Sequence, residues 1–399
     1  MTLMSEEEVG RVLVVGTAPP TRCGLASYTF NVSNALANQN LDVDILRVLD
    51  DGESEIGEPL TVSAHWRRQH RIDARSSASF ANTYDAVLLQ HEFGIYPGDD
   101  GVGVLDFLEH LDVPVVTVLH TIVSDPSTRQ RRIVDELGER SETLIVHSST
   151  ARERLLRLHD FDHREIKVIP HGASSRIGLS QPLHRTVPSM LTWGLIGPGK
   201  GIEHGIIAIA LLRGRGIDVE YVISGATHPN VLRDAGDGYR HSLVALSRQL
   251  GVEDLIRFDA HYRSREEQDQ IIRSASVVLL PYDSREQVTS GVLVEALASG
   301  KPIISTAFPH AKELRDCGGI ALVDHQRPDE IADAAQRILG DPGVHEVMRS
   351  ASWVEGLRHD WNVVGPRFSQ SVVRFMASSE LNSNVFQFEL SDEDKAVVA

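Results

Sequence analysis

The chain has 399 residues, of which 41% are hydrophobic, so it is long enough for two or three domains with apolar cores. It contains 39 Lys and Arg against 56 Asp and Glu, which gives a formal net charge of −17. This composition excludes a disordered chain and does not fit a protein with a broad basic face for duplex nucleic acid. We therefore expect no nucleic-acid partner.

The two cysteines, Cys23 and Cys317, lie far apart and form no Cys-x-x-Cys motif. Neither a disulfide framework nor a zinc site is indicated, and we expect two reduced thiols. The start of the chain is acidic where a signal peptide needs basic and then apolar residues, and no window approaches 18 consecutive apolar residues. The sequence therefore predicts a soluble cytoplasmic protein, and it leaves the oligomeric state open.

Short β-branched runs alternate with helical periods along the chain, which is typical of parallel sheets covered by helices. In the first half the predicted strands are Val12–Val15, Val43–Val48, Ala86–Gln90, Val113–His120, Thr143–Ser148 and Ile166–Pro170. In the second half they are Leu191–Ile196, Val219–Ser224, Ile256–His261, Val277–Pro281, Pro302–Thr306 and Ile320–Val323. Six runs in each half predict two Rossmann-like α/β domains.

A stretch rich in Gly, Ser and Pro, residues 171–189, separates the two sets of strands and is expected to connect the domains. We place the boundary near Leu183, giving an N-terminal domain of residues 1–183 and a C-terminal domain of residues 184–364. A helical segment at 365–378 follows and can cross back to the N-terminal domain. The polar, acidic tail at 379–399 is expected to bury little surface.

The first strand is followed by a loop with two prolines and Gly24, and then by a helix running to about Asn40. Amides at the start of that helix face the carboxyl edge of the sheet, where open α/β sheets bind ligands. The loop lacks the Gly-x-Gly-x-x-Gly pattern, so a nicotinamide cofactor is not indicated. A plain strand-to-helix turn is the alternative interpretation.

Polar side chains come directly after two further strands. His91 and Glu92 follow the strand at Ala86–Gln90, and His120 ends the strand at Val113–His120. Residues at these positions point into the crevice at the carboxyl edge, although one such histidine is as often structural as functional. Two strands with the same feature favour a functional site.

Lys200 lies in the turn GLIGPGKG, at the start of an amphipathic helix. A positive charge at a helix N-terminus opposes the helix dipole, so this lysine makes sense where an anion is bound. The spacing is not that of a Walker loop. A solvated surface lysine is the alternative.

Glu295 is the one acid inside VLVEALA, where every neighbour is apolar. Burying an unpartnered carboxylate costs several kcal/mol, and a pair of ligand hydroxyls would satisfy it. Ser290 and Gly291 start this helix, so the amides of residues 290–292 are expected to be free to donate to phosphate oxygens. The alternative is a glutamate that simply faces solvent.

Combined and in order, the motifs resemble retaining nucleotide-sugar glycosyltransferases of the GT-B fold, glycosyltransferase family 4. The resemblance spans nearly the whole folded chain and rests on the loop at Gly24, QHEFGI (90–95), LHT (119–121), VIPHG (168–172), GLIGPGKG (194–201), SGATHP (224–229), LLPY (279–282) and SGVLVEALASGKP (290–302). The QHEFGI and SGATHP segments are most similar to a bacterial mannosyltransferase-like subgroup. Two Rossmann-like domains facing each other across a cleft are therefore expected.

The resemblance also implies roles for individual residues. Glu295 would hold the nucleotide ribose, Lys200 would meet the diphosphate, and His120 would face the transferred sugar. The remaining donor-side positions are Gly24, Gly197, His261, Tyr262, Ser290, Gly291 and Val292, and the acceptor-side positions are His91, Glu92 and His120. The family usually has a catalytic Glu where this chain has Gln287, whose amide is expected to hydrogen-bond the donor sugar, and Glu286 is one residue out of register. The family also usually has Arg where Leu195 or Gly197 stands.

Three functions remain open at this point. The leading one is a metal-independent, retaining transfer of a hexose, with mannose favoured, from a nucleoside diphosphate sugar to an acceptor hydroxyl. GDP-mannose is the favoured donor and a UDP-sugar the alternative; no cofactor or catalytic metal is expected. The others are a glycoside phosphorylase on the same fold and a catalytically degenerate nucleotide-sugar-binding protein, the latter suggested by Gln287 and the missing Arg.

The acceptor, a sugar or a glycolipid, is the least defined partner. Residues 65–75, HWRRQHRIDAR, combine cations with Trp66, and a second basic cluster holds Arg129, Arg131 and Arg132. Either cluster can contact an anionic lipid headgroup at a membrane surface or an acidic glycan. The alternative is a solvated loop in an acidic protein.

Overall fold

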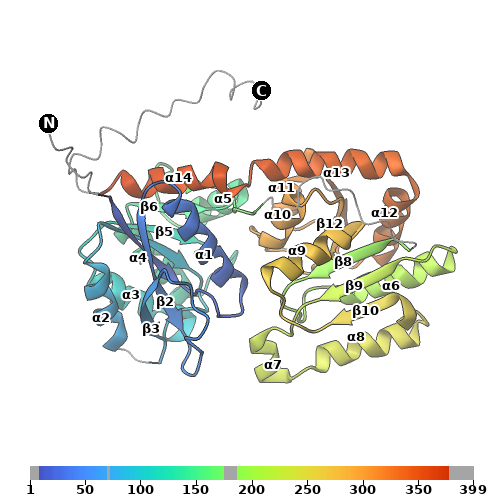
Figure 1. Cartoon of the computed structure of the whole chain (residues 1–399), viewed down its shortest axis with the longest axis horizontal. Helices are drawn as coiled ribbons and strands as arrows, with labels where there is room; N and C mark the ends of the chain where they lie inside the picture. Colours follow the sequence, from blue (N-terminus) through green and yellow to red (C-terminus); the bar gives the residue numbers. More distant parts are fainter. Residues whose placement is uncertain (1–8, 70–71, 175–186, 377–399) are drawn as a thin grey trace, which may run out of the picture.

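A computed structural model describes residues 9–69, 72–174 and 187–376, and its elements form two α/β domains side by side (Figure 1). The strands of the N-terminal domain are β1 (Arg11–Gly16), β2 (Asp42–Leu49), β3 (Val62–Arg67), β4 (Ala86–His91), β5 (Val115–Leu119), β6 (Thr143–Val146) and β7 (Ile166–Val168). The strands of the C-terminal domain are β8 (Ser189–Trp193), β9 (Glu220–Ser224), β10 (Ile256–Asp259), β11 (Val277–Leu280), β12 (Ile303–Thr306) and β13 (Ile320–Val323).

Helices connect most successive strands in both domains, but none lies between β2 and β3. The first domain contains α1 (Gly24–Ala37), α2 (Ile72–Ala81), α3 (Gly103–Glu109), α4 (Thr128–Arg140) and α5 (Ser149–Leu158). The second contains α6 (Ile202–Gly214), α7 (Pro229–Ala235), α8 (Gly238–Gln249), α9 (Arg265–Ser274), α10 (Gly291–Ala298), α11 (Pro309–Glu313), α12 (Pro328–Gly340) and α13 (Pro342–Leu357), and α14 (Trp361–Val373) follows.

Both sheets are parallel and have the same strand order. The first runs β3-β2-β1-β4-β5-β6-β7 and the second β10-β9-β8-β11-β12-β13. The order reverses between β1 and β4 in one domain and between β8 and β11 in the other. In open parallel sheets, ligands bind at the carboxyl ends of the strands beside such a reversal.

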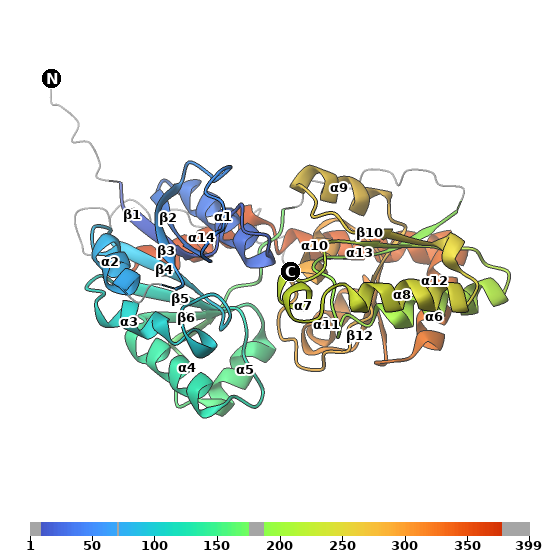
Figure 2. The same cartoon turned by 90° about the horizontal axis from the view of Figure 1, so that it is seen from below.

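Apolar clusters cover both faces of each sheet, which explains why most strands are nearly continuous apolar runs. In the first domain α1 packs on one face together with α14, while α2 to α5 cover the other (Figure 2). Helix α14 therefore belongs to the first domain in space, although it follows the second domain in sequence. The chain crosses between the domains twice.

The predicted strands are found within a few residues of their expected ends, but β3 was missed. Its sequence, VSAHWR, overlaps the start of the segment 65–75 that was interpreted as a basic surface, and it forms an edge strand. Trp66 is fully buried against Tyr96 and Phe107, with ring centroids 5.2 Å away in each case. The expectation of an aromatic side chain at a membrane interface is therefore wrong for Trp66.

Many of the surrounding cations are paired within the protein. Arg67 pairs with Glu55, Arg68 lies 2.8 Å from Asp50, and Arg129 lies 2.9 Å from Asp99. The two basic clusters are thus largely neutralised by local acids. His70 and Arg71 lie outside the described residues.

Several domain predictions fall partly outside the described part of the chain. The boundary at Leu183 and the tail at 379–399 are not among the described residues. The predicted helix at 365–378 corresponds to α14, which begins four residues earlier, at Trp361. Asp360 is its N-cap, and the Asp360 side chain accepts a hydrogen bond from the Asn362 amide (2.8 Å). The predicted division at residue 364 lies inside α14. The domain bounds themselves stay predictions.

Candidate active site

Two loops of the second domain meet at the strand-order reversal. One follows β8 and carries Lys200, and the other follows β11 and leads to Ser290. They are joined by a hydrogen bond from the Asp283 amide to the Gly199 carbonyl (3.0 Å). Gly201 makes this contact sterically feasible, because its φ is +62° and a Cβ there would lie 1.8 Å from the Pro281 carbonyl oxygen.

Lys200 points from the first loop towards the second. Its Nζ lies 4.4 Å from the centroid of the Tyr282 ring, a cation–π contact that holds the ammonium group between the two strand ends. The side chain is partly exposed, so it remains accessible to an anion. Its charge also contributes to lowering the pKa of His228, after burial, which is the larger cause.

Three side chains next to this loop could hold a metal ion. Ligand atoms of Glu203, His204 and Asp283 lie within 4.8 Å of one another. His204 Nε2 is 3.3 Å from an Asp283 oxygen, and Glu203 accepts a hydrogen bond from the Tyr239 hydroxyl (2.6 Å). The sequence did not indicate this cluster, because its acids lie about 80 residues apart.

Glu295 lies on α10 and is already surrounded by donors. Gln268 Nε2 lies 2.9 Å and Trp193 Nε1 3.4 Å from its Oε2, and Arg265 lies 3.3 Å from its Oε1. Burial raises the pKa of the Glu295 carboxyl, while Arg265 and Trp193 limit the rise. Protein donors thus already partner this carboxylate, and a quarter of the Glu295 side chain (24%) is still exposed.

Helix α10 begins where predicted, at Ser290 and Gly291, but the Ser290 amide that was expected to be free for phosphate is already bonded. The hydroxyl of Ser290 caps the helix by accepting from the Leu293 amide (3.2 Å), and the Ser290 amide donates to His310 Nδ1 (2.9 Å). The amides of Gly291 and Val292 lie in the first helical turn, where no intrahelical acceptor exists. His171, which precedes the connection between the domains, lies directly over Gly291, since a Cβ there would be 3.0 Å from His171 Nε2.

Gln287 lies in the loop before α10 and is half-buried. Its carbonyl accepts from the His310 amide (3.3 Å). The adjacent Glu286 pairs with Arg154 of the first domain, with 3.3 Å between Nη2 and Oε2. The acid one residue out of register is therefore turned towards the other domain and away from α10.

On the facing domain, aromatic and histidine rings surround Tyr28 of α1. Its ring centroid lies 4.8 Å from those of His120 and His171 and 5.3 Å from those of His147 and Trp361. These rings come from the ends of β5, β6 and β7 and from α14. His120 Nε2 lies 2.8 Å from the Gln90 side-chain oxygen, which orients the ring.

Several polar atoms of this ring cluster are buried and make no hydrogen bond within the described part of the chain. They are Tyr28 Oη, Gln90 Nε2, His147 Nε2 and Trp361 Nε1. Burial lowers the pKa of His147 to about 4 and that of His120 well below its ordinary value. The histidines are thus neutral near pH 7, and the cluster offers hydrogen-bond donors and acceptors without charge.

His91 is a correction to the sequence analysis. It is fully buried on the other face of the sheet, against Phe93 and Tyr96, and burial lowers its pKa to about 3. Consecutive strand residues point to opposite faces, so Gln90 and not His91 reaches His120. Glu92 remains partly accessible; it accepts from Thr121 Oγ1 (2.5 Å), and burial raises its pKa.

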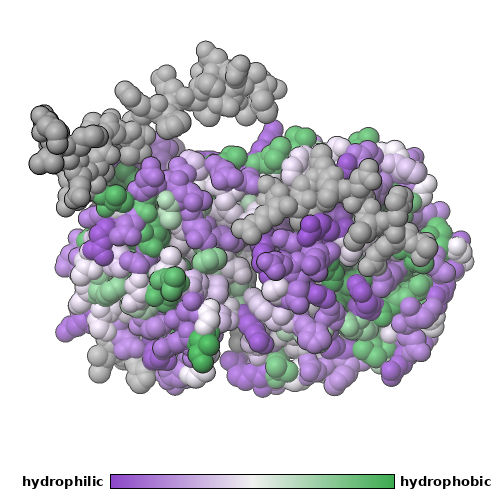
Figure 3. Space-filling view, in the orientation of Figure 1, coloured by the Kyte–Doolittle hydropathy of each residue, from purple (hydrophilic) through white to green (hydrophobic). Residues whose placement is uncertain are grey.

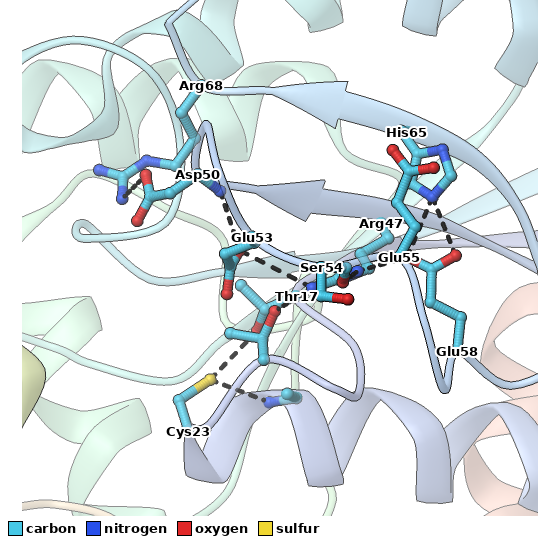
Figure 4. Close-up of polar contacts among 12 residues, drawn as sticks. Thr17, Cys23, Arg47, Asp50, Glu53, Ser54, Glu55, Glu58, His65 and Arg68 are labelled. Atoms are coloured by element: carbon cyan, nitrogen blue, oxygen red, sulfur yellow. Dashed lines mark hydrogen bonds and ion pairs between the residues drawn. The ribbon is translucent and has the colours of Figure 1, made fainter.

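The loop at Gly24 is held by a buried arginine that the sequence analysis did not single out (Figure 4). Arg47, at the end of β2, is fully buried, pairs with Glu58 and donates to Thr21 Oγ1 (2.9 Å). Cys23 caps α1, its Sγ accepting from the Ala26 amide (3.3 Å). Gly24 is exposed, and a Cβ there would meet no atom within 4 Å, so the start of α1 is open to solvent.

His261 and Tyr262, two of the expected donor-side residues, differ in their contacts. His261 is bonded to Asp259 (3.1 Å) and its side chain is 90% exposed. Tyr262 reaches the first domain, where the Arg22 guanidinium lies 5.8 Å from its ring centroid.

The surface between the domains is hollowed on the face shown in Figure 3, and this face is largely hydrophilic.

No helix among the described residues combines the length and hydrophobicity needed to cross a membrane.

Sequence reasoning missed His147 and His171, although the rule that selected His120 applies to both. His147 directly follows the buried strand β6, and His171 directly follows the predicted strand at Ile166–Pro170. It also missed Tyr28 and Trp361, because an aromatic residue on a helix usually indicates a core position.

Known proteins resemble both halves of the chain. Residues 23–175 match the family described as Glycosyltransferase Family 4, and residues 181–352 match the family described as Glycosyl transferases group 1. Alpha-D-kanosaminyltransferase of Streptomyces kanamyceticus is 25% identical, the alignment covering 65% of this chain and 72% of that protein. D-inositol 3-phosphate glycosyltransferase of Actinosynnema mirum is 29% identical, with 60% and 62% covered, so less than two thirds of that protein is matched.

Solved structures share the architecture at low sequence identity. Sucrose-phosphate synthase from Thermosynechococcus elongatus has a TM-score of 0.72 at 17% identity, covering 90% of this chain and 98% of that one. HepE from Anabaena, solved with UDP and glucose, has a TM-score of 0.72 at 14% identity, covering 91% and 99%.

Together, the fold and the two facing strand-order reversals define a two-domain protein of the GT-B class. Each domain matches a glycosyltransferase family model of its own. Both matches support a glycosyltransferase, and each covers less than half of the chain.

Proposed function

We propose that the protein is a retaining hexosyltransferase that moves a hexose, with mannose favoured, from a nucleoside diphosphate sugar to an acceptor hydroxyl. One observation carries the proposal. Lys200, the first turn of α10 and Glu295 lie around the strand-order reversal between β8 and β11, so an ammonium, free amides and a carboxylate serve one ligand. These groups match a diphosphate and the ribose attached to it.

The residues act by stabilising the leaving group. Negative charge develops on the diphosphate as the bond to the sugar breaks. Lys200 and the α10 amides therefore interact more strongly with the transition state than with the intact bound donor. The released phosphate oxygen then takes the proton of the attacking hydroxyl on the same face of the sugar, which retains configuration. No metal is needed for this step, and Glu203, His204 and Asp283 are the residues to test for one.

The acceptor is proposed to be a polyhydroxylated molecule, either a free sugar or the head of a glycolipid. Support comes from the ring cluster around Tyr28, whose buried donors and acceptors lack partners in the described residues. Leaving such groups unpaired costs about 1–3 kcal/mol each, and sugar hydroxyls can donate to His147 and accept from Tyr28. His120 and His171 are partly exposed, and His171 lies over Gly291 of the second domain.

GDP-mannose is proposed as the first donor to test and a UDP-hexose as the second. The resemblance of the QHEFGI and SGATHP segments supports mannose. The test is mass spectrometry of the products formed from a donor and acceptor panel. A product heavier than the acceptor by one hexose is expected, and consumption of phosphate with a glycoside but of no nucleotide sugar would instead indicate a phosphorylase.

A degenerate nucleotide-sugar-binding protein is the second candidate, because of Gln287. Glu286 does not replace a carboxylate there, since it faces Arg154. Such a protein would bind the nucleotide sugar while donor hydrolysis and transfer both stayed at background.

A further inference from the structure

The loop that carries Gln287 belongs to the second domain but is fastened to the first. Val288 is buried (3% exposed) within the apolar core of the first domain, among residues from the sheet and helices of that domain. The carbonyl of Val288 accepts from the Ser148 hydroxyl (2.7 Å), which also caps α5. This contact crosses 140 residues of sequence and lies entirely out of solvent.

Arg154 makes the second fastening, from the middle of α5. Its side chain is 9% exposed, and its Nη1 donates to two carbonyl oxygens, those of Ile122 and Glu286, at 2.9 Å each. Ile122 follows His120 and Thr121 directly, whereas Glu286 precedes Gln287. One guanidinium nitrogen thus joins the segment of His120 to the segment of Gln287.

Gln287 itself is held from the opposite side. The carbonyls of residues 286 and 288 bond to the first domain, but the carbonyl of Gln287 accepts from His310 of the second domain. The backbone of residues 286–288 is therefore bonded alternately to the two domains. This alternation fixes the rotation of the segment and hence the direction of the Gln287 side chain.

We propose that Arg154 is a positioning residue that sets the relative placement of Gln287 and His120 across the cleft. The proposal rests on the proposed function, because it assumes that both residues meet the transferred sugar. Arg154 does not need to touch either substrate. Its two carbonyl bonds tie the acceptor-side segment to the donor-side loop, and a displacement of about 1 Å at a reacting centre can cost a hundredfold in rate.

Nucleotide binding should be independent of this tie. The Ser290 amide is bonded to His310, and Glu295 is bonded to Gln268. The residues proposed to hold the ribose and the phosphates are therefore positioned by contacts within the second domain. Loss of Arg154 should lower kcat and leave the affinity for free nucleotide unchanged.

The test compares Arg154→Met, Arg154→Lys and the control Arg157→Met, a change at an exposed residue of the same helix. Arg154→Met should reduce kcat at least tenfold while the Kd for GDP or UDP, from calorimetry, changes less than threefold. Arg154→Lys should recover part of the rate, because an ammonium can serve one carbonyl but lacks the planar geometry for both. Equal losses in Arg154→Met and Arg157→Met would overturn the proposal.

Hydrogen–deuterium exchange separates this proposal from the proposed function. In Arg154→Met the amides of residues 120–124 and of residues 284–290 should both exchange faster, whether or not the wild-type protein transfers sugar. Unchanged exchange in both segments refutes the tie, even if transfer is established. If Arg154→Met does not fold, the same two readouts on Arg154→Lys decide the question.

Discussion

Replacing Glu295 tests the donor site most specifically. The carboxylate has donors at 2.9, 3.3 and 3.4 Å, yet 24% of the side chain stays exposed and can accept from a ribose. A hydrogen bond to a charged group contributes about 1.5–3 kcal/mol, so Glu295→Ala should weaken nucleotide binding by about 10- to 150-fold. Arg265 and Gln268 retain access to solvent, so the fold should survive.

Calorimetry with GDP and UDP measures this loss, and thermal unfolding reports on the fold. Ser299→Ala is the matched control, because Ser299 is the C-cap of α10 and its hydroxyl donates to the backbone carbonyl of Glu295 (2.7 Å), away from the Glu295 carboxylate. The control should leave nucleotide affinity unchanged. The reasoning is refuted if Glu295→Ala binds nucleotide as tightly as the wild type does.

Four further predictions concern charge, sugar contacts and pH. Lys200→Ala should lower turnover far more than nucleotide affinity, and a chelator should leave the wild-type rate unaltered; an absolute need for a divalent ion would contradict the metal-free step. Gln287→Glu should cost tenfold or more in transfer, since it removes both amide donors and can leave an acceptor unpaired at about 1–3 kcal/mol, whereas a gain in rate would mark Gln287 as decayed. Tyr28→Phe should raise the acceptor KM several-fold without altering the donor Kd, and an unchanged KM would remove Tyr28 from the acceptor site. His91 has a pKa of about 3 in the fold and about 6.5 when unfolded, so only the unfolded chain gains its proton as the pH falls below 6.5. Lowering the pH from 7 to 5 therefore reduces the free energy of unfolding of the wild type by about 2 kcal/mol through His91. In denaturant unfolding, His91→Leu should show a decrease over this pH range that is smaller by that amount. An identical decrease in both proteins would refute the assignment.

The sequence predicted the parallel sheets well because buried parallel strands are continuous apolar runs. The edge strand β3 escaped this rule, since its one buried side chain, Trp66, stands between charged residues. A strand with one protected face and few neighbours needs no apolar run. The basic residues around it suggested a surface loop for the same reason.

The second-domain site was predicted more fully than the first-domain site. Lys200, Ser290 and Glu295 lie in turns and helix starts whose local sequence fixes their geometry. The direction of a side chain at a strand end depends on register, so Gln90 and His91 exchanged places relative to the prediction. Arg154 could not be found at all, because its role depends on contacts with residues 32 and 132 positions away.

The central claim is that the two domains together transfer a sugar from a nucleotide with retention of configuration. Nuclear magnetic resonance of a turnover mixture tests it most directly, because the anomeric signals of donor and product are seen together and the one-bond C1–H1 coupling reports the configuration at each. We predict that GDP-mannose, or failing that a UDP-hexose, is consumed only with acceptor and protein present, and that the new glycoside keeps the donor's anomeric configuration. A product of inverted configuration, or a donor panel that binds but stays intact with every acceptor, would contradict the account.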